Sequence, residues 1–253
     1  MVDLESLGYC IAGMGIGGFL FYKGFKWFKT KRMIENMPTS KIRGLAMGLV
    51  EIAGNVVPAK KTTLKSPLTG KSCVYYKYSV KEERGSGKHR YWYTLKAGTD
   101  MQEFFLKDST GKVLVQPQKA QIDIPPDFKY QSRWRKDPPQ VVQKFLKKNS
   151  LNFETFLGTN KNMRYYEYYI APKDKLYILG HAGDNPHVEE ATGQQNTEDI
   201  MIQKGDEGIY YISDSSEEGV LKKFKWKVIG GLFGGGALIV ICLALFLLQL
   251  GIY

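Results

Sequence analysis

A short stretch of histidine and carboxylate side chains is the densest group of potential metal ligands in this sequence. It reads HAGDNPHVEE over residues 181–190 and contains His181, Asp184 and His187. Imidazole and carboxylate groups are ordinary zinc ligands, so these three residues are the candidates for a divalent-metal site. The same composition is more common in solvated loops, and we therefore expect no metal and no other cofactor.

Two glycine-containing motifs resemble nucleotide-binding signatures without meeting their requirements. Gly13, Gly15 and Gly18 fit G-x-G-x-x-G, but they lie in an apolar segment, whereas the dinucleotide fingerprint follows a strand in a βαβ unit. The run from Gly70 resembles the end of a P-loop, but Lys65 stands where that motif requires glycine. The sequence therefore predicts no catalytic residue, and we expect the chain not to be an enzyme by itself.

Charged and aromatic residues are mixed in three further stretches. Glu167 lies within RYYEYYI, where its carboxylate either faces solvent or pairs with a base such as Arg164. The stretches 89–93 and 130–136 combine basic and aromatic side chains that would suit stacking on nucleic-acid bases. On β-hairpins such residues more often form cross-strand pairs, so nucleic acid is a disfavoured partner.

Two apolar segments flank the region that must position these side chains. Residues 228–250 carry no charged side chain and are long enough for a helix to cross the hydrocarbon layer of roughly 30 Å. Residues 6–28 contain a shorter uncharged run, and a secretory signal peptide is disfavoured there because Asp3 and Glu5 make the start acidic. We expect two transmembrane helices.

Small residues recur at intervals of four in both segments, as Gly13-x-x-x-Gly17 and Gly231-x-x-x-Gly235. Such spacing lets two membrane helices approach closely, and it predicts a helical hairpin. The alternative is that glycine is simply common in membrane helices.

Basic and aromatic residues gather at the inner end of each apolar segment, in a chain whose net charge is +11. They form the predicted membrane interface: Trp27, Lys29, Lys31, Arg32, Lys222, Lys223, Lys225, Trp226 and Lys227. The positive-inside rule then places the soluble part in the cytoplasm, and anionic lipid headgroups are an expected partner.

The region between the spans, residues 29–215, is predicted to form one β-rich soluble domain, joined to the second span by a juxtamembrane helix over 216–227. Runs rich in Val and Tyr at 72–83 and 163–170 predict strands. Ser215-x-x-Glu218 is a capping box that predicts a helix start. Because strands and helices do not alternate, the fold class is α+β, a mainly antiparallel β domain (barrel or sandwich-like) flanked by two transmembrane helices.

Several segments occur in an order that resembles a known family. They are GLVEIAG at 48–54, SPLTGKSCVYY at 66–76, and Asp108-x-Thr110-Gly111, followed by Tyr166-Glu167 and Pro172. Together with the flanking spans they resemble the GIDE family, also called the beside-a-membrane (BAM) domain. Its eukaryotic members are mitochondrial membrane-anchored E3 ubiquitin ligases, which carry a RING after the second span and place the central domain in the intermembrane space.

A RING binds two zinc ions, each through four Cys or His ligands. This sequence contains three Cys and three His, scattered along the chain, so we expect a RING-less form of the family. The expected function is a membrane-tethered, non-catalytic interaction or regulatory module that binds a protein, peptide or lipid headgroup beside the bilayer. Ser66, Pro67, Gly70 and Lys71 form its expected binding surface. The alternative is a component of an E3 ubiquitin-protein ligase, active in ubiquitin-like protein transfer and membrane organisation, that needs a RING from a partner.

Overall fold

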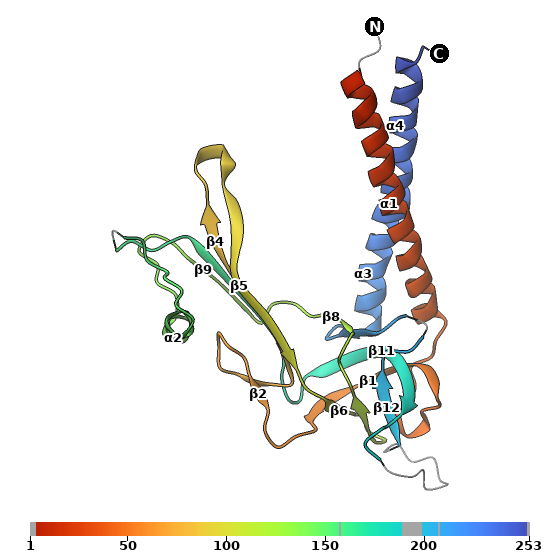
Figure 1. Cartoon of the computed structure of the whole chain (residues 1–253). Helices are drawn as coiled ribbons and strands as arrows, with labels where there is room; N and C mark the ends of the chain where they lie inside the picture. The colour runs from red at the N-terminus through yellow and green to blue at the C-terminus, as the bar shows by residue number, and fades with distance from the viewer. Residues whose placement is uncertain (1–3, 157, 189–198, 207, 252–253) are drawn as a thin grey trace. The chain divides into compact units, whose positions relative to one another are not determined.

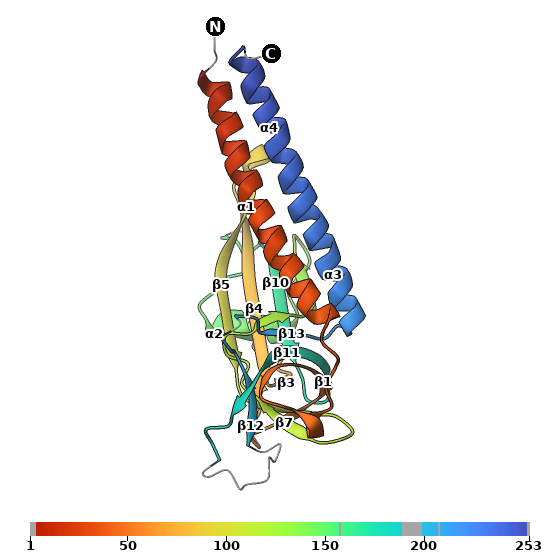
Figure 2. The same ribbon diagram turned by 90° about the vertical axis from the view of Figure 1, so that its right-hand side faces the viewer.

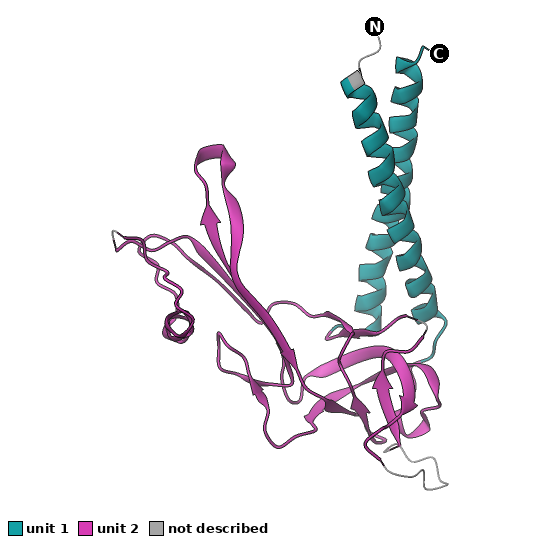
Figure 3. Cartoon of the chain, viewed as in Figure 1, with its two compact units in different colours: residues 1–38, 215–253 teal, residues 39–214 magenta. Residues whose placement is uncertain are grey.

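The computed structural model of the chain describes residues 4–156, 158–188, 199–206 and 208–251. The chain divides into two compact units, drawn in different colours in Figure 3. Unit 1 combines residues 1–38 with residues 215–253 and is helical, whereas unit 2 comprises Thr39–Asp214 and is rich in β-structure.

Unit 1 is an antiparallel pair of long helices, seen side by side in Figures 1 and 2. One is α1 (Leu4–Glu35), and the other is a rod made of α3 (Glu217–Ile229), a π-helical turn η3 (Gly230–Gly234) and α4 (Gly235–Gln249). Among the described residues, this rod is the one helix long and apolar enough to cross a membrane, with a mean hydropathy of 2.6 in its most apolar window. Helix α1 does not reach the same apolarity, so the first span remains a prediction.

The two helices of unit 1 touch through glycine. A Cβ added to Gly24 would lie 2.6 Å from the backbone nitrogen of Leu232, and one added to Gly235 would lie 2.8 Å from the carbonyl oxygen of Gly17. As predicted, Gly13, Gly17, Gly231 and Gly235 all lie at the contact. The closest backbone approach joins Gly24 to Gly231, and a side chain on either glycine would force the helices apart.

Unit 2 is built on a seven-stranded sheet, five strands of which close into a barrel. The order is β1-β6-β7-β12-β11-β13-β8, and β1 also pairs with β11, which joins the two ends of the first five strands. The strands are β1 (Gly48–Pro58), β6 (Phe104–Lys107), β7 (Lys112–Val115), β8 (Gln121–Asp123), β11 (Lys175–Asp184), β12 (Ile200–Gln203) and β13 (Tyr211–Ser213). Apolar side chains of alternate strand positions, such as Ile52, Phe104 and Ile178, fill the interior.

A second, four-stranded antiparallel sheet extends from the barrel in the order β5-β4-β10-β9. Its strands are β4 (Tyr75–Arg84), β5 (Tyr91–Met101), β9 (Phe128–Ser132) and β10 (Met163–Ile170). The amphipathic helix α2 (Gln140–Lys148) packs Val142 and Leu146 against one face, where they join Val80 and Tyr165 in a separate core. Remaining short elements are β2 (Leu64–Lys65), β3 (Ser72–Cys73) and the 3-10 turns η1 (Ile42–Gly44) and η2 (Gly87–His89).

The predicted mainly antiparallel β domain is therefore confirmed, and of the two predicted forms, barrel or sandwich-like, the sheet has the barrel form. Among the described strands, parallel pairing occurs only between β7 and β12 and between β8 and β13. The predicted cap of the helix before the second span is wrong by one residue. Ser216, and not Ser215, is the N-cap of α3, and its Oγ accepts a hydrogen bond from the backbone N–H of Gly219 at 3.3 Å.

Candidate functional site

The predicted binding loop connects β2 to β3 in unit 2. Its ends are held by a backbone hydrogen bond from Ser66 N–H to the carbonyl of Lys71 at 2.9 Å, and Gly70 N–H donates back to Ser66. The Ser66 hydroxyl oxygen accepts from Lys71 N–H at 3.0 Å and also contacts the Thr69 hydroxyl. Gly70 adopts a φ of +72°, which favours glycine. These bonds define a tight six-residue turn.

A carboxylate from a different sheet fixes the middle of this loop. Glu167 on β10 is fully buried, and its two oxygens accept hydrogen bonds from Leu68 N–H at 2.6 Å and from the Thr69 hydroxyl at 2.5 Å. Leu68 is buried in the core under α2. Neither sequence-based interpretation of Glu167 is correct, because the carboxylate is not on the solvent face and Arg164 instead lies over the ring of Trp92.

The outward part of the loop consists of Gly70 and Lys71, which are exposed, whereas Ser66 is buried and Pro67 is half-buried. The loop therefore presents a cation on a rigid turn. Nearby Cys73 is buried, and this burial, with the negative charge of Glu167, raises the pKa of its thiol to about 12. A thiol with that pKa stays protonated at neutral pH, so Cys73 is not suited to act as a nucleophile.

The fold does not bring the three candidate metal ligands together. His181 and Asp184 lie on β11 three residues apart, so they occupy opposite faces of the strand, and His187 lies beyond its end with its Nε2 3.4 Å from a carboxylate oxygen of Glu103. Within the ranges that the structure describes, no three His, Cys, Asp or Glu side chains are placed to hold a metal ion. Glu189 and Glu190 of the same stretch lie outside the described residues.

The predicted membrane-interface residues lie at one end of unit 1. Gly24 abuts Gly231, so the basic turns that follow Gly24 on α1 and precede Gly231 on α3 are at the same end of the helix pair. Trp226 is 65% exposed there. The helix pair thus carries an apolar length and a basic, aromatic end, which is the pattern of a span and its headgroup border.

These features define a class of protein in which a β-rich domain, with a barrel and a side sheet, is inserted between the two helices of a hairpin, one of them able to span a membrane. The model of the GIDE family, described as E3 ubiquitin ligase, matches residues 75–247. That range covers more than half of the sequence, and the chain belongs to the GIDE family. The comparisons with curated proteins and with solved structures each found no match.

The matched range begins after the candidate loop and contains Glu167, the residue that holds it. The sequence signal for Glu167 was present in the strand alternation. Met163, Tyr165 and Glu167 occupy alternate positions on β10, so they share one face, and the first two are large and apolar. A carboxylate in register with a buried row requires hydrogen-bond donors inside the protein.

Proposed function

We propose that this member of the GIDE family is a membrane-tethered, non-catalytic interaction module that binds a protein, peptide or lipid headgroup through the Ser66–Lys71 loop. The observation that carries the proposal is the pair of hydrogen bonds from the loop to the buried Glu167 carboxylate. A buried carboxylate destabilises a folded protein unless it accepts hydrogen bonds. The donors that Glu167 requires are supplied by this turn, so the carboxylate and the turn hold each other in place.

A fixed loop favours binding because less conformational freedom is lost when a partner arrives. The exposed Lys71 supplies charge, and Gly70 leaves its backbone open to close approach. The proposal includes two spans, a soluble unit on the cytoplasmic side, and contact of the basic end of unit 1 with anionic headgroups. It is supported by the apolar rod, the glycine contacts and the basic residues described above.

Site-specific photocrosslinking tests this function. We expect benzoylphenylalanine at Lys71, irradiated in native membranes, to give a discrete adduct that mass spectrometry identifies. The substitution Glu167→Gln should lower its yield several-fold, because an amide nitrogen replaces one of the two acceptor oxygens. Thr69→Val removes the hydroxyl that contacts both Glu167 and Ser66 but leaves the bond from Leu68 N–H to the carboxylate, and it should also lower the yield.

The matched control places the same crosslinker at Lys60, an exposed residue of unit 2 outside the loop. Identical adducts from Lys60 and Lys71, or a yield indifferent to Glu167→Gln in a protein of unchanged melting temperature, would contradict the proposed role of the loop.

The second candidate is a component of an E3 ligase that acts with a RING from a partner, and the family match favours it. It is tested with the full chain in nanodiscs, supplied with ubiquitin, its activating and conjugating enzymes, and RING proteins recovered by the crosslinking. Conjugates that require both the chain and a RING protein support this function. Conjugates formed by the chain without any RING protein would overturn the non-catalytic proposal.

A further inference from the structure

The end of the four-stranded sheet that is remote from the barrel is strongly basic. The β4–β5 hairpin and the segment after β9 both reach this end, because β4, β9 and β10 are in register through Glu82, Ser132 and Met163. Its exposed cations, here called the basic end of the sheet, are Arg84, Lys88, Arg90, Arg133, Arg135 and Lys136.

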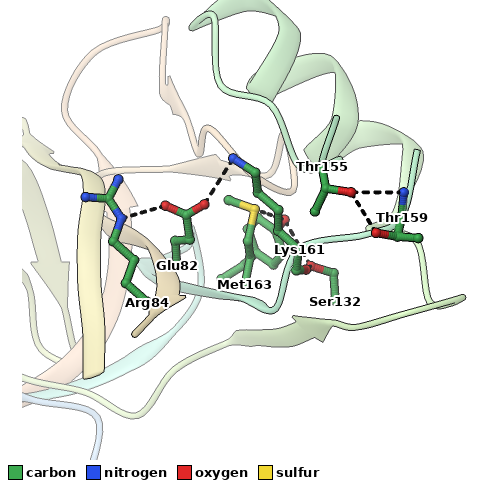
Figure 4. Close-up of polar contacts among 8 residues, drawn as sticks. Glu82, Arg84, Ser132, Thr155, Thr159, Lys161 and Met163 are labelled. Atoms are coloured by element: carbon green, nitrogen blue, oxygen red, sulfur yellow. Dashed lines mark hydrogen bonds and ion pairs between the residues drawn. The ribbon is translucent and has the colours of Figure 1, made fainter. Parts of the chain in front are cut away.

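The acidic groups at the same end are already engaged. Figure 4 shows Glu82 between Arg84 and Lys161, at 2.9 Å and 3.0 Å. Glu83 accepts a hydrogen bond from Asn162, and Asp137 accepts one from Asn160 at 2.6 Å. Arg84 and Lys161 pair with Glu82, and the five other exposed cations outnumber Glu83 and Asp137, so this end has a net positive charge.

Aromatic rings protrude among these cations. Trp134 is 64% exposed and Tyr91 is 55% exposed, on two segments that are far apart in sequence. Exposed Trp and Tyr beside Lys and Arg suit the headgroup layer of a bilayer, where an amphipathic ring and a cation are both stabilised.

The flat face of the sheet argues against stacked bases as the ligand. Arg164 lies 3.8 Å from the ring centroid of Trp92, and Lys129 lies over Tyr166. A sheet that binds single-stranded nucleic acid offers open rings to successive bases. Here cations of the protein already cover rings on the face. The same holds at the end of the sheet, where Arg135 lies 4.3 Å from the ring centroid of Trp134 and Arg84 lies 4.0 Å from that of Tyr93.

We propose that the basic end of the four-stranded sheet docks onto anionic phospholipid headgroups of the bilayer in which unit 1 is anchored. Tethering keeps that bilayer within constant reach, so weak contacts from several exposed cations suffice. The contact is a second attachment of unit 2, in addition to its two covalent connections to unit 1. This inference depends on the proposed anchoring and not on the Ser66–Lys71 loop.

The test uses the full chain in nanodiscs with an environment-sensitive dye on Ser86→Cys, at the exposed tip of the β4–β5 hairpin. The discs contain a nitroxide-labelled lipid as quencher. Discs of phosphatidylcholine alone are compared with discs that also hold about 30% phosphatidylglycerol, an anionic lipid. We expect quenching in the anionic discs and none in the neutral discs. At about 0.5 M salt the quenching in the anionic discs should decrease strongly, because salt screens the attraction between the cations and the headgroups.

Two variants with the same loss of charge locate the effect. Changing Lys88, Arg90, Arg133 and Arg135 to Gln should abolish the quenching, whereas changing the exposed Lys60, Lys61, Lys107 and Lys204 to Gln should preserve it. Absence of quenching in anionic discs overturns the proposal, as does equal loss in both variants. A dye that responds to a single-stranded oligonucleotide and not to anionic lipid would assign the surface to nucleic acid instead. Crosslinking from Lys71 is measured on the same variants, so failure of the docking is distinguished from failure of the proposed function.

Discussion

At the scale of single residues, two carboxylates of unit 2 act as acceptors that organise loops. Glu167 holds the β2–β3 loop, and Asp108 holds the β6–β7 turn. The Asp108 carboxylate accepts from the backbone N–H groups of Ile42, Thr110 and Gly111 and from the Thr110 hydroxyl. Such N–H groups would otherwise lack partners, so both carboxylates support local structure that hydrophobic packing alone does not fix.

Asp108 predicts a measurable dependence of stability on pH. Burial works to raise the pKa of Asp108, but the hydrogen bonds from Ile42, Thr110 and Gly111 outweigh it and lower the pKa from 3.8 to about 2. A depressed folded-state pKa gives stability that is present above about pH 4 and is lost as the pH falls toward 2. We expect Asp108→Asn to lower the free energy of unfolding by about 2 kcal/mol at neutral pH.

Denaturant unfolding followed by circular dichroism, at pH values between 7 and 3, measures this difference. The difference in the free energy of unfolding between the native chain and Asp108→Asn should become smaller as the solution becomes more acidic. Asp184→Asn, at an exposed carboxylate, is the control and should change little. A difference in the free energy of unfolding that stays constant over the whole pH range would contradict the lowered pKa of Asp108.

Single residues also show the limit of prediction from the sequence. The pattern of RYYEYYI correctly predicted a strand over residues 163–170 but not the partner of Glu167. The partner, Leu68, lies almost a hundred residues earlier, on the loop of the predicted binding surface. The alternation of residues along a segment predicts that it forms a strand. The hydrogen-bond partner of a buried carboxylate depends on how the sheets are arranged, which that alternation does not specify.

At the scale of elements, the glycine contacts between α1 and the C-terminal rod were predictable because interval-of-four spacing has a direct geometric meaning. The approach at Gly24 was not predicted. Gly24 lies between Lys23 and Phe25, near the basic end, where no second small residue completes the spacing. Its partner Gly231 lies in the π-helical turn, a departure from α-helical geometry at the point of closest approach.

The helix contact predicts a specific disulfide. A Cβ added to Gly13 would lie 3.6 Å from the Cβ of Cys242, within the range of natural disulfides. In a chain with Cys10→Ser and Cys73→Ser, we expect Gly13→Cys to form an intrachain bond to Cys242 on mild oxidation. A protease site placed in unit 2 reveals it, because the two fragments stay joined until reductant is added.

Gly15→Cys is the matched control, since a Cβ at Gly15 has no neighbour within 4 Å. Equal joining of fragments by Gly13→Cys and Gly15→Cys would contradict the described packing. Disulfide-linked dimers in place of joined fragments would show that these helices pair between copies of the chain.

At the scale of the whole molecule, closure of the barrel is what the sequence left open. Strand β1 pairs with β11 from Gly48 opposite Ala182 to Asn55 opposite Lys175. Alternation of apolar residues along a strand serves a barrel and a sandwich equally well. The choice depends on which distant strands become neighbours, and local sequence does not encode that.

Orientation is also a property of the whole molecule. The basic ends of both helices predict that unit 2 lies in the cytoplasm. A cysteine introduced at Ser109, an exposed residue of the β6–β7 turn, should therefore react with a membrane-impermeant maleimide only after the cells are permeabilised. Its labelling in intact cells would place unit 2 on the other side. A cysteine at Lys60 provides a second reporter in the same unit.

The glycine contact between α1 and the C-terminal rod has a consequence for how the protein is made. All of unit 2 lies between these helices in the chain, so the ribosome must complete it before α1 can meet its partner. Until then the less apolar α1 lacks the surface that covers Gly13, Gly17 and Gly24. Completion of the hairpin therefore depends on synthesis of the last helix.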